Sequence, residues 1–310
     1  MKKVMCLQLA MQWSAIVLLT AGVLANLAHA QQIAFTWDDL PAHSALPPGE
    51  TRIEIGRKLI AAMREAHMPP AYGFVNGEFA EKEPLSTPML QEWRDAGLPL
   101  GNHTWSHMNL NQRPLAEWEA DVLKNEPLLK SYMKDNDWHW LRFPYLAEGD
   151  TPEKRRDARA FLQSHGYRIA GVTMSFADYL YNEPYARCVA KNDTAAIAQL
   201  EEAYLKAADA TIDYTRSMSK TLYNRDIPYV LLMHVGALDA RMLPRLLELY
   251  RDKGFTFVTL EKAEQDPFYK NDLSLSLPET TDSLEDAMRT HNLQLPPRPA
   301  PTIDLNTICR

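Results

Sequence analysis

Short apolar runs alternate with segments of helical periodicity between residues 31 and 260. The runs are rich in β-branched, aromatic and aliphatic side chains, and we expect a strand in each of them. They are Ile33–Trp37, Tyr72–Val75, Leu98–Gly101, His139–Phe143, Arg168–Thr173, Tyr229–His234 and Phe255–Leu260. Strands that alternate with helices are typical of an α/β fold with a mainly parallel sheet. Seven such units in roughly 230 residues fit one domain, because α/β barrels of this size are single domains.

The segments between the runs carry ordinary helix signals. An apolar stripe with helical spacing predicts the first helix, and cap residues bracket those that follow. The apolar stripe is Ile55–Met63, and the segments that follow are Thr87–Gly97, Thr151–Gly166 and Leu243–Gly254.

Two regions lie outside this regular alternation. The apolar residues of Asp193–Arg225 fall on one face, which predicts a long helical insert on the outside of the sheet. After Leu260 the chain becomes polar and rich in proline, and it ends in Leu295-Pro296-Pro297-Arg298-Pro299, which cannot continue a helix or a central strand. We therefore expect one domain at residues 31–263 and a C-terminal tail at residues 264–310 that lies on it.

The first thirty residues have the pattern of a signal peptide. Lys2 and Lys3 precede the apolar run Ala15–Leu27, and Ala28-His29-Ala30 offers small residues for cleavage near Ala30. The run is shorter than the roughly 18–20 residues of a spanning helix, although an uncleaved anchor stays an alternative. We expect an exported, periplasmic or secreted, protein with no integral membrane domain in the mature chain.

Charge and cysteine content narrow the range of partners. The net charge is −7, from 33 basic and 40 acidic residues, and loss of Lys2 and Lys3 changes it to 31 − 40 = −9. Such an acidic surface argues against nucleic acid or anionic lipid as partner, since both are bound mainly by Lys and Arg. The mature chain keeps Cys188 and Cys309, which allow one disulfide in an oxidising compartment.

Two adjacent carboxylates follow the first predicted strand. Asp38 and Asp39 come directly after Trp37, at the strand end where α/β barrels place catalytic groups. Adjacent residues at a strand end point to different sides, so one carboxylate can bind a metal ion while the other acts as a base. By itself the pair is also compatible with a solvated acidic turn.

Two histidines, His103 and His107, follow the third predicted strand with a spacing of four. A helical turn would place both imidazoles on one face, about 6 Å apart, close enough to share an ion. Imidazole suits zinc and its first-row neighbours, and a catalytic zinc uses three protein ligands. Two histidines are one ligand short, and Asp38 or Asp39 would complete the set.

Two further candidates stand at strand ends. Arg142 ends the fourth predicted strand, and a buried arginine can hold a carboxylate in a fixed pose through paired hydrogen bonds. His234 ends the apolar strand that begins at Tyr229, where a histidine is well placed for proton transfer. Each signal is weak alone, but all of them lie at the same end of one predicted sheet.

The order of these motifs resembles that of the polysaccharide deacetylases, the NodB-like carbohydrate esterase family 4, from Ile33 to Leu260. The family has an Asp-Asp pair, His-Ser/Thr-x-x-His, Arg-x-Pro-Tyr, Asp-x-x-Asp-Trp and Leu-x-His. This chain has Thr36-Trp37-Asp38-Asp39, His103-Thr104-Trp105-Ser106-His107, Arg142-Phe143-Pro144-Tyr145, Ser175-Phe176-Ala177-Asp178-Tyr179 and Leu232-Met233-His234. The fourth motif departs from the pattern, because Ser175 replaces an aspartate and Tyr179 a tryptophan.

The resemblance implies a single distorted (β/α)7 barrel and a divalent metal site. Asp39, His103 and His107 would hold the metal, most simply zinc, with cobalt, manganese or nickel as other candidates. Asp38 would be the general base, and His234 would protonate the leaving amine.

The resemblance also implies two supporting roles. The backbone N–H of Tyr145 would stabilise the oxyanion together with the metal. Arg142, paired with Asp178, would keep Asp38 oriented and ionised.

The function implied is that of an exported, metal-dependent hydrolase that removes N-acetyl groups from a glycan, with an acetylated glycan as partner. Two alternatives remain open: the same site acting on O-acetyl esters or a small non-sugar amide, and a non-catalytic glycan-binding protein with a structural metal. The oligomeric state is not indicated by the sequence.

Overall fold

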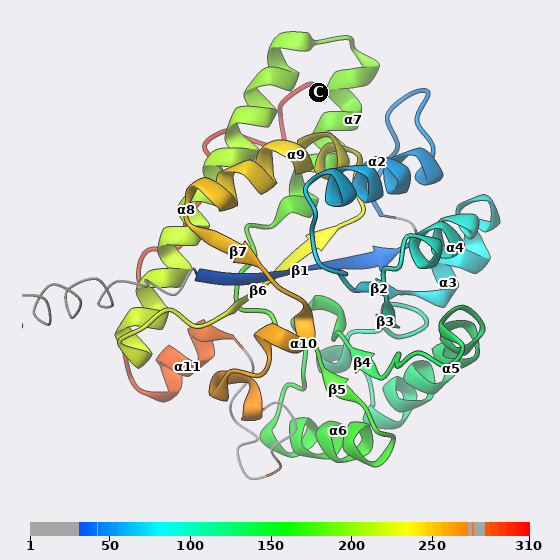
Figure 1. Cartoon of the computed structure of the whole chain (residues 1–310), viewed down its shortest axis with the longest axis vertical. Coiled ribbons are helices and arrows are strands. Elements are labelled where there is room, and N and C mark those ends of the chain that lie inside the picture. Colours follow the sequence, from blue (N-terminus) through cyan, green and yellow to red (C-terminus); the bar gives the residue numbers. More distant parts are fainter. Residues whose placement is uncertain (1–30, 42, 272–274, 276–282) are drawn as a thin grey trace, which may run out of the picture.

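A parallel sheet of seven strands forms the centre of the protein (Figure 1). The computed structural model describes residues 31–41, 43–271, 275 and 283–310, so the expected signal peptide lies outside the described residues. The strands are β1 (Gln31–Leu40), β2 (Gly73–Val75), β3 (Leu100–Asn102), β4 (Trp140–Leu141), β5 (Arg168–Ile169), β6 (Tyr229–His234) and β7 (Phe255–Phe257). All of their pairings are parallel, which confirms the predicted α/β class.

The sheet curls so that its two edges approach each other. Its strand order is β5-β4-β3-β2-β1-β6, and β7 pairs with the start of β1. Beyond β5, Met174 forms a bridge with Leu231 in β6, and its carbonyl accepts a hydrogen bond from the Leu232 N–H at 3.0 Å. The chain after β5 therefore joins the other edge, as expected for a distorted (β/α)7 barrel.

The observed strand ends differ from the predicted ones. β1 continues through the two aspartates to Leu40, because Asp38 pairs with His234 of β6. β4, β5 and β7 end earlier than predicted. Apolar residues beyond them are buried by other contacts: Phe143, for example, stacks on Trp118, with ring centroids 5.2 Å apart.

Helices cover the outside of the curled sheet, and a long one packs beside them (Figure 1). They are α2 (Arg52–Glu65), α3 (Gly77–Lys82), α4 (Pro88–Asp95), α5 (Leu115–Met133), α6 (Pro152–Ser164), α7 (Asn182–Ala190), α8 (Thr194–Tyr223), α9 (Ala237–Asp252), α10 (Leu260–Ala263) and α11 (Leu284–Thr290). Short 3-10 turns are η1 (Pro84–Ser86), η2 (Leu110–Gln112), η3 (Pro144–Leu146), η4 (Asp178–Tyr181) and η5 (Pro267–Asn271). The helix α8 is the predicted insert. None of the helices in the described ranges combines the length and apolar character needed to cross a bilayer.

Alternation along β1 decides which side chains face the inside of the curled sheet. Ala34 belongs to a small apolar cluster with Phe74 and other residues of the strands, whereas Phe35 and Trp37 belong to the larger core that also includes the helices. Residues two apart on a strand share a face, so Asp38 follows Ala34 to the inside. This places Asp38 at the carboxyl end of the barrel interior.

The C-terminal tail is attached to the body by a disulfide. Cys188 in α7 bonds to Cys309, so the disulfide that the sequence allows is present. Arg187 donates hydrogen bonds to the carbonyls of Leu305 and Ile308 at 2.9 and 3.2 Å. The C-terminus consequently lies beside α7 (Figure 1).

Candidate active site

A buried arginine holds Asp38 at the end of β1. Arg142 is 1% exposed, and its Nη1 donates to Oδ1 of Asp38 at 3.1 Å. Its other nitrogens donate to the Thr36 hydroxyl at 3.0 Å and to the Ala170 carbonyl at 2.8 Å. Because the guanidinium is fixed on three sides, it holds the Asp38 carboxylate in one orientation.

The segment from His103 to His107 is an irregular loop and not the helical turn that would place both rings on one helix face. Thr104 and His107 have positive φ angles of 58° and 55°, which a right-handed helix does not contain. The loop still brings the two imidazoles together, with ring centroids 4.9 Å apart.

Two buried asparagines, to which the sequence analysis gave no role, fix this loop. Asn76 donates to the carbonyls of His103 and Thr104 at 2.5 and 3.0 Å. Asn102 accepts a hydrogen bond from the Thr104 N–H at 2.8 Å. Their positions could have indicated a role in the site, because Asn76 follows β2 and Asn102 ends β3, at the same edge of the sheet as the catalytic candidates.

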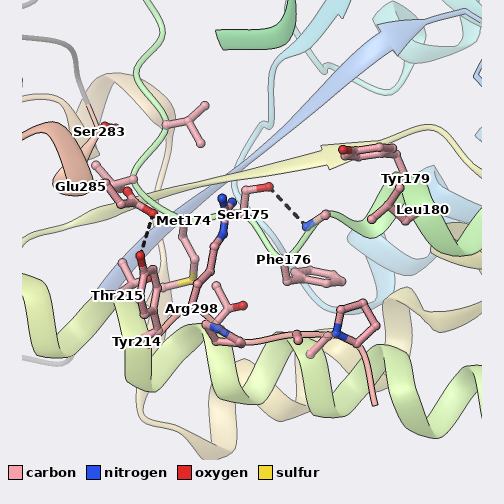
Figure 2. Close-up of a pocket in the computed structure, with 18 of the residues that line it drawn as sticks. Met174, Ser175, Phe176, Tyr179, Leu180, Tyr214, Thr215, Ser283, Glu285 and Arg298 are labelled. Carbon is pink, nitrogen blue, oxygen red and sulfur yellow. Dashed lines mark hydrogen bonds between the residues drawn. The ribbon is translucent and has the colours of Figure 1, made fainter. Parts of the chain in front are cut away.

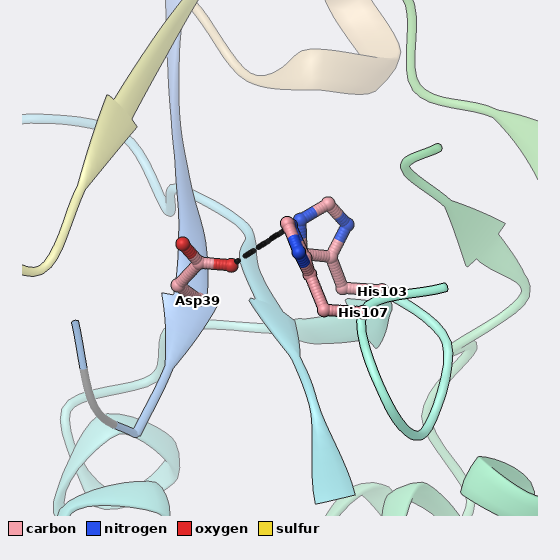
Figure 3. A group of neighbouring side chains, drawn as sticks. All are labelled: Asp39, His103 and His107. Carbon is pink, nitrogen blue, oxygen red and sulfur yellow. Dashed lines mark ion pairs between the residues drawn. The ribbon is translucent and has the colours of Figure 1, made fainter. Parts of the chain in front are cut away.

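Asp39, His103 and His107 form a compact set of potential metal ligands (Figure 3). Oδ1 of Asp39 lies 3.5 Å from Nε2 of His103 and 3.4 Å from Nε2 of His107. Asp39 has a φ of 63°, so its side chain leaves the regular alternation of β1 and points to the histidines. The structure thus brings together the three residues named as metal ligands.

The hydrogen bonds of this set leave lone pairs at its centre. Nδ1 of His103 lies 2.8 Å from the Arg142 carbonyl. Because a carbonyl only accepts, Nδ1 carries the proton, so the neutral form of the ring has its lone pair on Nε2. Burial and the neighbouring His103 ring lower the pKa of His107 to about 4, so that this ring is neutral near pH 7.

One oxygen of the set is buried without a partner. Oδ1 of Asp39 has no hydrogen-bond partner among the described residues, although it is inaccessible to solvent. Such an atom in a native structure calls for an explanation, and a bound cation is one. One carboxylate and two imidazoles match the three protein ligands of a catalytic zinc site.

Asp178 holds His234 at the end of β6. The buried carboxylate of Asp178 accepts a hydrogen bond from the His234 backbone N–H at 2.7 Å, and its other oxygen lies 3.0 Å from Nδ1. Burial lowers the pKa of His234, but the Asp178 carboxylate outweighs this effect and raises that pKa to about 10. The imidazole is therefore protonated near neutral pH, as a general acid must be.

The pairing of Asp178 with Arg142 that the resemblance implied is not formed. Both oxygens of Asp178 contact His234, and Arg142 contacts Asp38 instead. Ala177 has a φ of 56°, and this turn directs η4 to the end of β6. The path of the loop decides the partner of Asp178.

Two exposed tyrosines flank the site. Tyr145 is 66% exposed, and its ring lies 4.5 Å from that of His107. Tyr179 is 44% exposed and lies 5.3 Å from the ring of His234. Tyr145 also has a φ of 59°, a conformation that costs a non-glycine residue energy and is found often at functional sites.

A third histidine that the sequence analysis missed contacts Asp39. Nδ1 of His43 lies 2.8 Å from Oδ2 of Asp39, and its ring lies 4.7 Å from that of His234. Burial raises the pKa of Asp39, but the hydrogen bond from His43 and the charges of the nearby imidazoles outweigh it and keep this pKa well below its ordinary value. His43 belongs to none of the five motifs, and only its closeness to Asp39 in the chain was a signal.

Two cavities adjoin the site on the side of the C-terminal tail. One, of about 350 Å³, lies between the chain after β5, α8 and Arg298 of the tail (Figure 2). The other, of about 470 Å³, extends from His43 to Arg310. Tyr179, Leu180 and Pro301 line both cavities.

The structure is a curled α/β barrel with acidic, histidine and arginine side chains at the carboxyl ends of its strands, which is where α/β barrels carry their active sites. The family model described as polysaccharide deacetylase matches residues 26–170. This match and the order of the motifs agree that the chain is similar to the polysaccharide deacetylases, the NodB-like carbohydrate esterase family 4. No curated protein matches it.

Solved structures share the fold at low sequence identity. An activity-restored mutant of BA3943, a carbohydrate esterase family 4 pseudoenzyme from Bacillus anthracis, is 14% identical, with a TM-score of 0.52 over 76% of this chain and 68% of that one. T48 deacetylase with substrate is 19% identical, with a TM-score of 0.50 over 76% and 92%. The peptidoglycan deacetylase PdaC from Bacillus subtilis is 16% identical, with a TM-score of 0.50 over 76% and 91%. At these identities the likeness shows the fold.

Proposed function

We propose that this chain is an exported, metal-dependent hydrolase that removes N-acetyl groups from a glycan and releases acetate. The observation that carries the proposal is the buried, unpartnered Oδ1 of Asp39 beside Nε2 of His103 and of His107. These side chains would hold the cation, most simply zinc, with cobalt, manganese or nickel as other candidates. Bound there, a divalent cation would polarise an acyl carbonyl and make water more acidic.

The neighbouring side chains suit the two proton transfers of amide hydrolysis. Asp38, oriented by Arg142, would accept a proton from the attacking water. His234, protonated because of Asp178, would donate a proton to the leaving nitrogen. Attack of water on the acyl carbon and protonation of the nitrogen break the C–N bond, and the products are acetate and a free amine.

A glycan substrate fits the surroundings of the site. The rings of Tyr145 and Tyr179 are exposed on either side of it and would stack on sugar rings. The two tail-side cavities would take neighbouring sugar units. The backbone N–H of Tyr145 would donate to the oxyanion. PdaC of B. subtilis, which shares the fold, is a peptidoglycan deacetylase.

Two features support export. Residues 1–30 have the composition of a signal peptide, with cleavage near Ala30. The Cys188–Cys309 disulfide suits an oxidising compartment. In the proposed mature protein, residues 31–263 form the catalytic domain and residues 264–310 the tail.

Acetate release from N-acetylglucosamine oligomers tests the proposal. We expect the purified mature protein to release acetate, a chelator to abolish the release, and added zinc or cobalt to restore it, because the ligand set requires a cation. Release from O-acetyl esters alone would replace the amide assignment by an esterase activity. If the protein binds the glycan but releases no acetate, it is a non-catalytic glycan-binding protein.

The pH dependence of turnover tests the role of Asp178. Because this carboxylate raises the pKa of His234 to about 10, the protonated acid is lost only as the pH rises through that value. In Asp178→Asn the raising charge is gone, so we expect the alkaline limb of the kcat profile to move to lower pH. Initial rates of acetate release across the pH range measure the shift.

Asp137→Asn is the matched control for this variant. Asp137 also contacts a histidine, since its Oδ1 lies 2.9 Å from Nδ1 of His139, but Asp137 is exposed and His139 is partly exposed, far from the buried site. We expect its alkaline limb to coincide with that of the unmodified protein. An alkaline limb that stays in place in Asp178→Asn would contradict the acid role of His234.

A further inference from the structure

His43 is a polar neighbour of the metal site that lies outside all five family motifs. Its Nδ1 lies 2.8 Å from Oδ2 of Asp39, and its side chain is 16% exposed. We propose that His43 is a positioning residue that holds Asp39 in the orientation that binds the cation. This inference rests on the metal site of the proposed function.

The two oxygens of Asp39 have different surroundings. Oδ1 faces Nε2 of His103 and of His107 at 3.5 and 3.4 Å, and no described residue forms a hydrogen bond with it. Oδ2 is occupied by His43. Since an ionised carboxylate only accepts, Nδ1 of His43 is the donor in this bond. The hydrogen bond thus leaves one oxygen free for the cation and prevents rotation of the carboxylate about its Cβ–Cγ bond.

The position of His43 is itself fixed by the helix that follows. Arg52, the first residue of α2, donates from Nη1 to the His43 carbonyl at 2.5 Å. The same guanidinium donates to Glu83 from Nε at 3.0 Å, and its side chain is only 12% exposed. The loop between β1 and α2 is therefore connected to the body at the residue that contacts Asp39.

The ring of His43 also packs against that of His234. The centroids are 4.7 Å apart and the planes are tilted by 36°. This contact gives the His43 ring a second support, on the side of the proposed acid. Hydrogen-bonding partners of metal ligands fix ligand orientation, and their loss typically costs about 10–100-fold in metal affinity or activity.

Zinc affinity, measured without substrate, tests the proposal. For His43→Ala we expect zinc to bind about 10–100-fold more weakly, in competition with a chromophoric chelator. For His43→Asn, whose amide nitrogen stands where Nδ1 stands in histidine, we expect most of the affinity to return. The visible spectrum of the cobalt-loaded protein should change in the alanine variant and resemble the unmodified protein in the asparagine variant.

The matched control is His291→Ala, because His291 is exposed at the end of α11. It should bind zinc like the unmodified protein, and thermal unfolding of all variants in chelator should show that each is folded. Equal zinc affinity of His43→Ala and the unmodified protein would overturn the positioning role alone, and so would equal losses in the alanine and asparagine variants. Absence of zinc binding by the unmodified protein would overturn the proposed function and this inference together.

Discussion

Replacement of His103 by alanine is expected to remove bound zinc and, with it, the release of acetate. Nε2 of His103 faces Asp39, and Nδ1 is fixed by the Arg142 carbonyl, so the ring is prepared to bind a cation. Alanine leaves two ligands where catalytic zinc needs three. We therefore expect turnover to fall by more than about 100-fold, which is the largest loss usually seen when a residue that supports a metal ligand is removed. Zinc content after dialysis and the rate of acetate release measure both effects.

His139→Ala is the control for this experiment. His139 is a partly exposed histidine that contacts Asp137 and directly precedes β4, at the opposite end of the strand from Arg142. Its loss should leave zinc content and acetate release unchanged. If folded His103→Ala retained a full complement of zinc, the metal site assigned to Asp39, His103 and His107 would be wrong.

Replacement of Asp38 by asparagine is expected to lower kcat by about 10²–10⁴-fold, the usual contribution of general acid–base catalysis. Asparagine has nearly the same shape, and its oxygen can still accept from Nη1 of Arg142, which lies 3.1 Å from Oδ1 of Asp38. The amide cannot accept the proton of the attacking water. Zinc should remain bound, because Asp38 is not among the three proposed ligands. Acetate release and zinc content, measured on the same preparation, separate the two effects.

Asp39→Asn is the matched comparison, since it makes the same chemical change at the adjacent residue. It should lose zinc, whereas Asp38→Asn should keep it. Equal zinc loss in both variants would show that the roles are not divided as proposed, and zinc loss in Asp38→Asn alone would exchange them. Thermal unfolding of the apo-proteins shows whether the Asp38→Asn effect includes unfolding, because Arg142 is buried with its partner.

Much of the site could be located from the sequence because its residues follow strands. Asp38, His103, Arg142 and His234 stand at the carboxyl ends of predicted runs, and parallel strands bring these ends to one edge of the sheet. The strand β6 has the predicted bounds, and the apolar pattern is also sufficient for the long helix α8. Strand ends are harder to predict, because apolar residues of the following loop extend the apolar run without being part of the sheet. Phe143, for example, packs on Trp118.

Other parts of the site depend on contacts between residues far apart in the chain. Periodicity carries no information on the path of a loop, so the sequence did not indicate that Asp178 reaches His234 rather than Arg142. The same holds for Asn76, which fixes the loop of His103 from its position directly after β2. Likewise the spacing of His103 and His107 indicated a shared ion, but positive φ angles bring the rings together, not a helical turn.

By itself the sequence determined the α/β class, the edge of the sheet that carries the chemistry and the residues that could bind a cation. Local side-chain patterns suffice for these properties, because strands and helices follow from spacing. Only the tertiary structure decided that Asp39 turns one oxygen to two histidines and the other to His43, that Asp178 supports His234, and that Cys309 joins the tail to α7. These contacts depend on where loops end in space, since a hydrogen bond requires two groups within about 3 Å of each other whatever their separation along the chain.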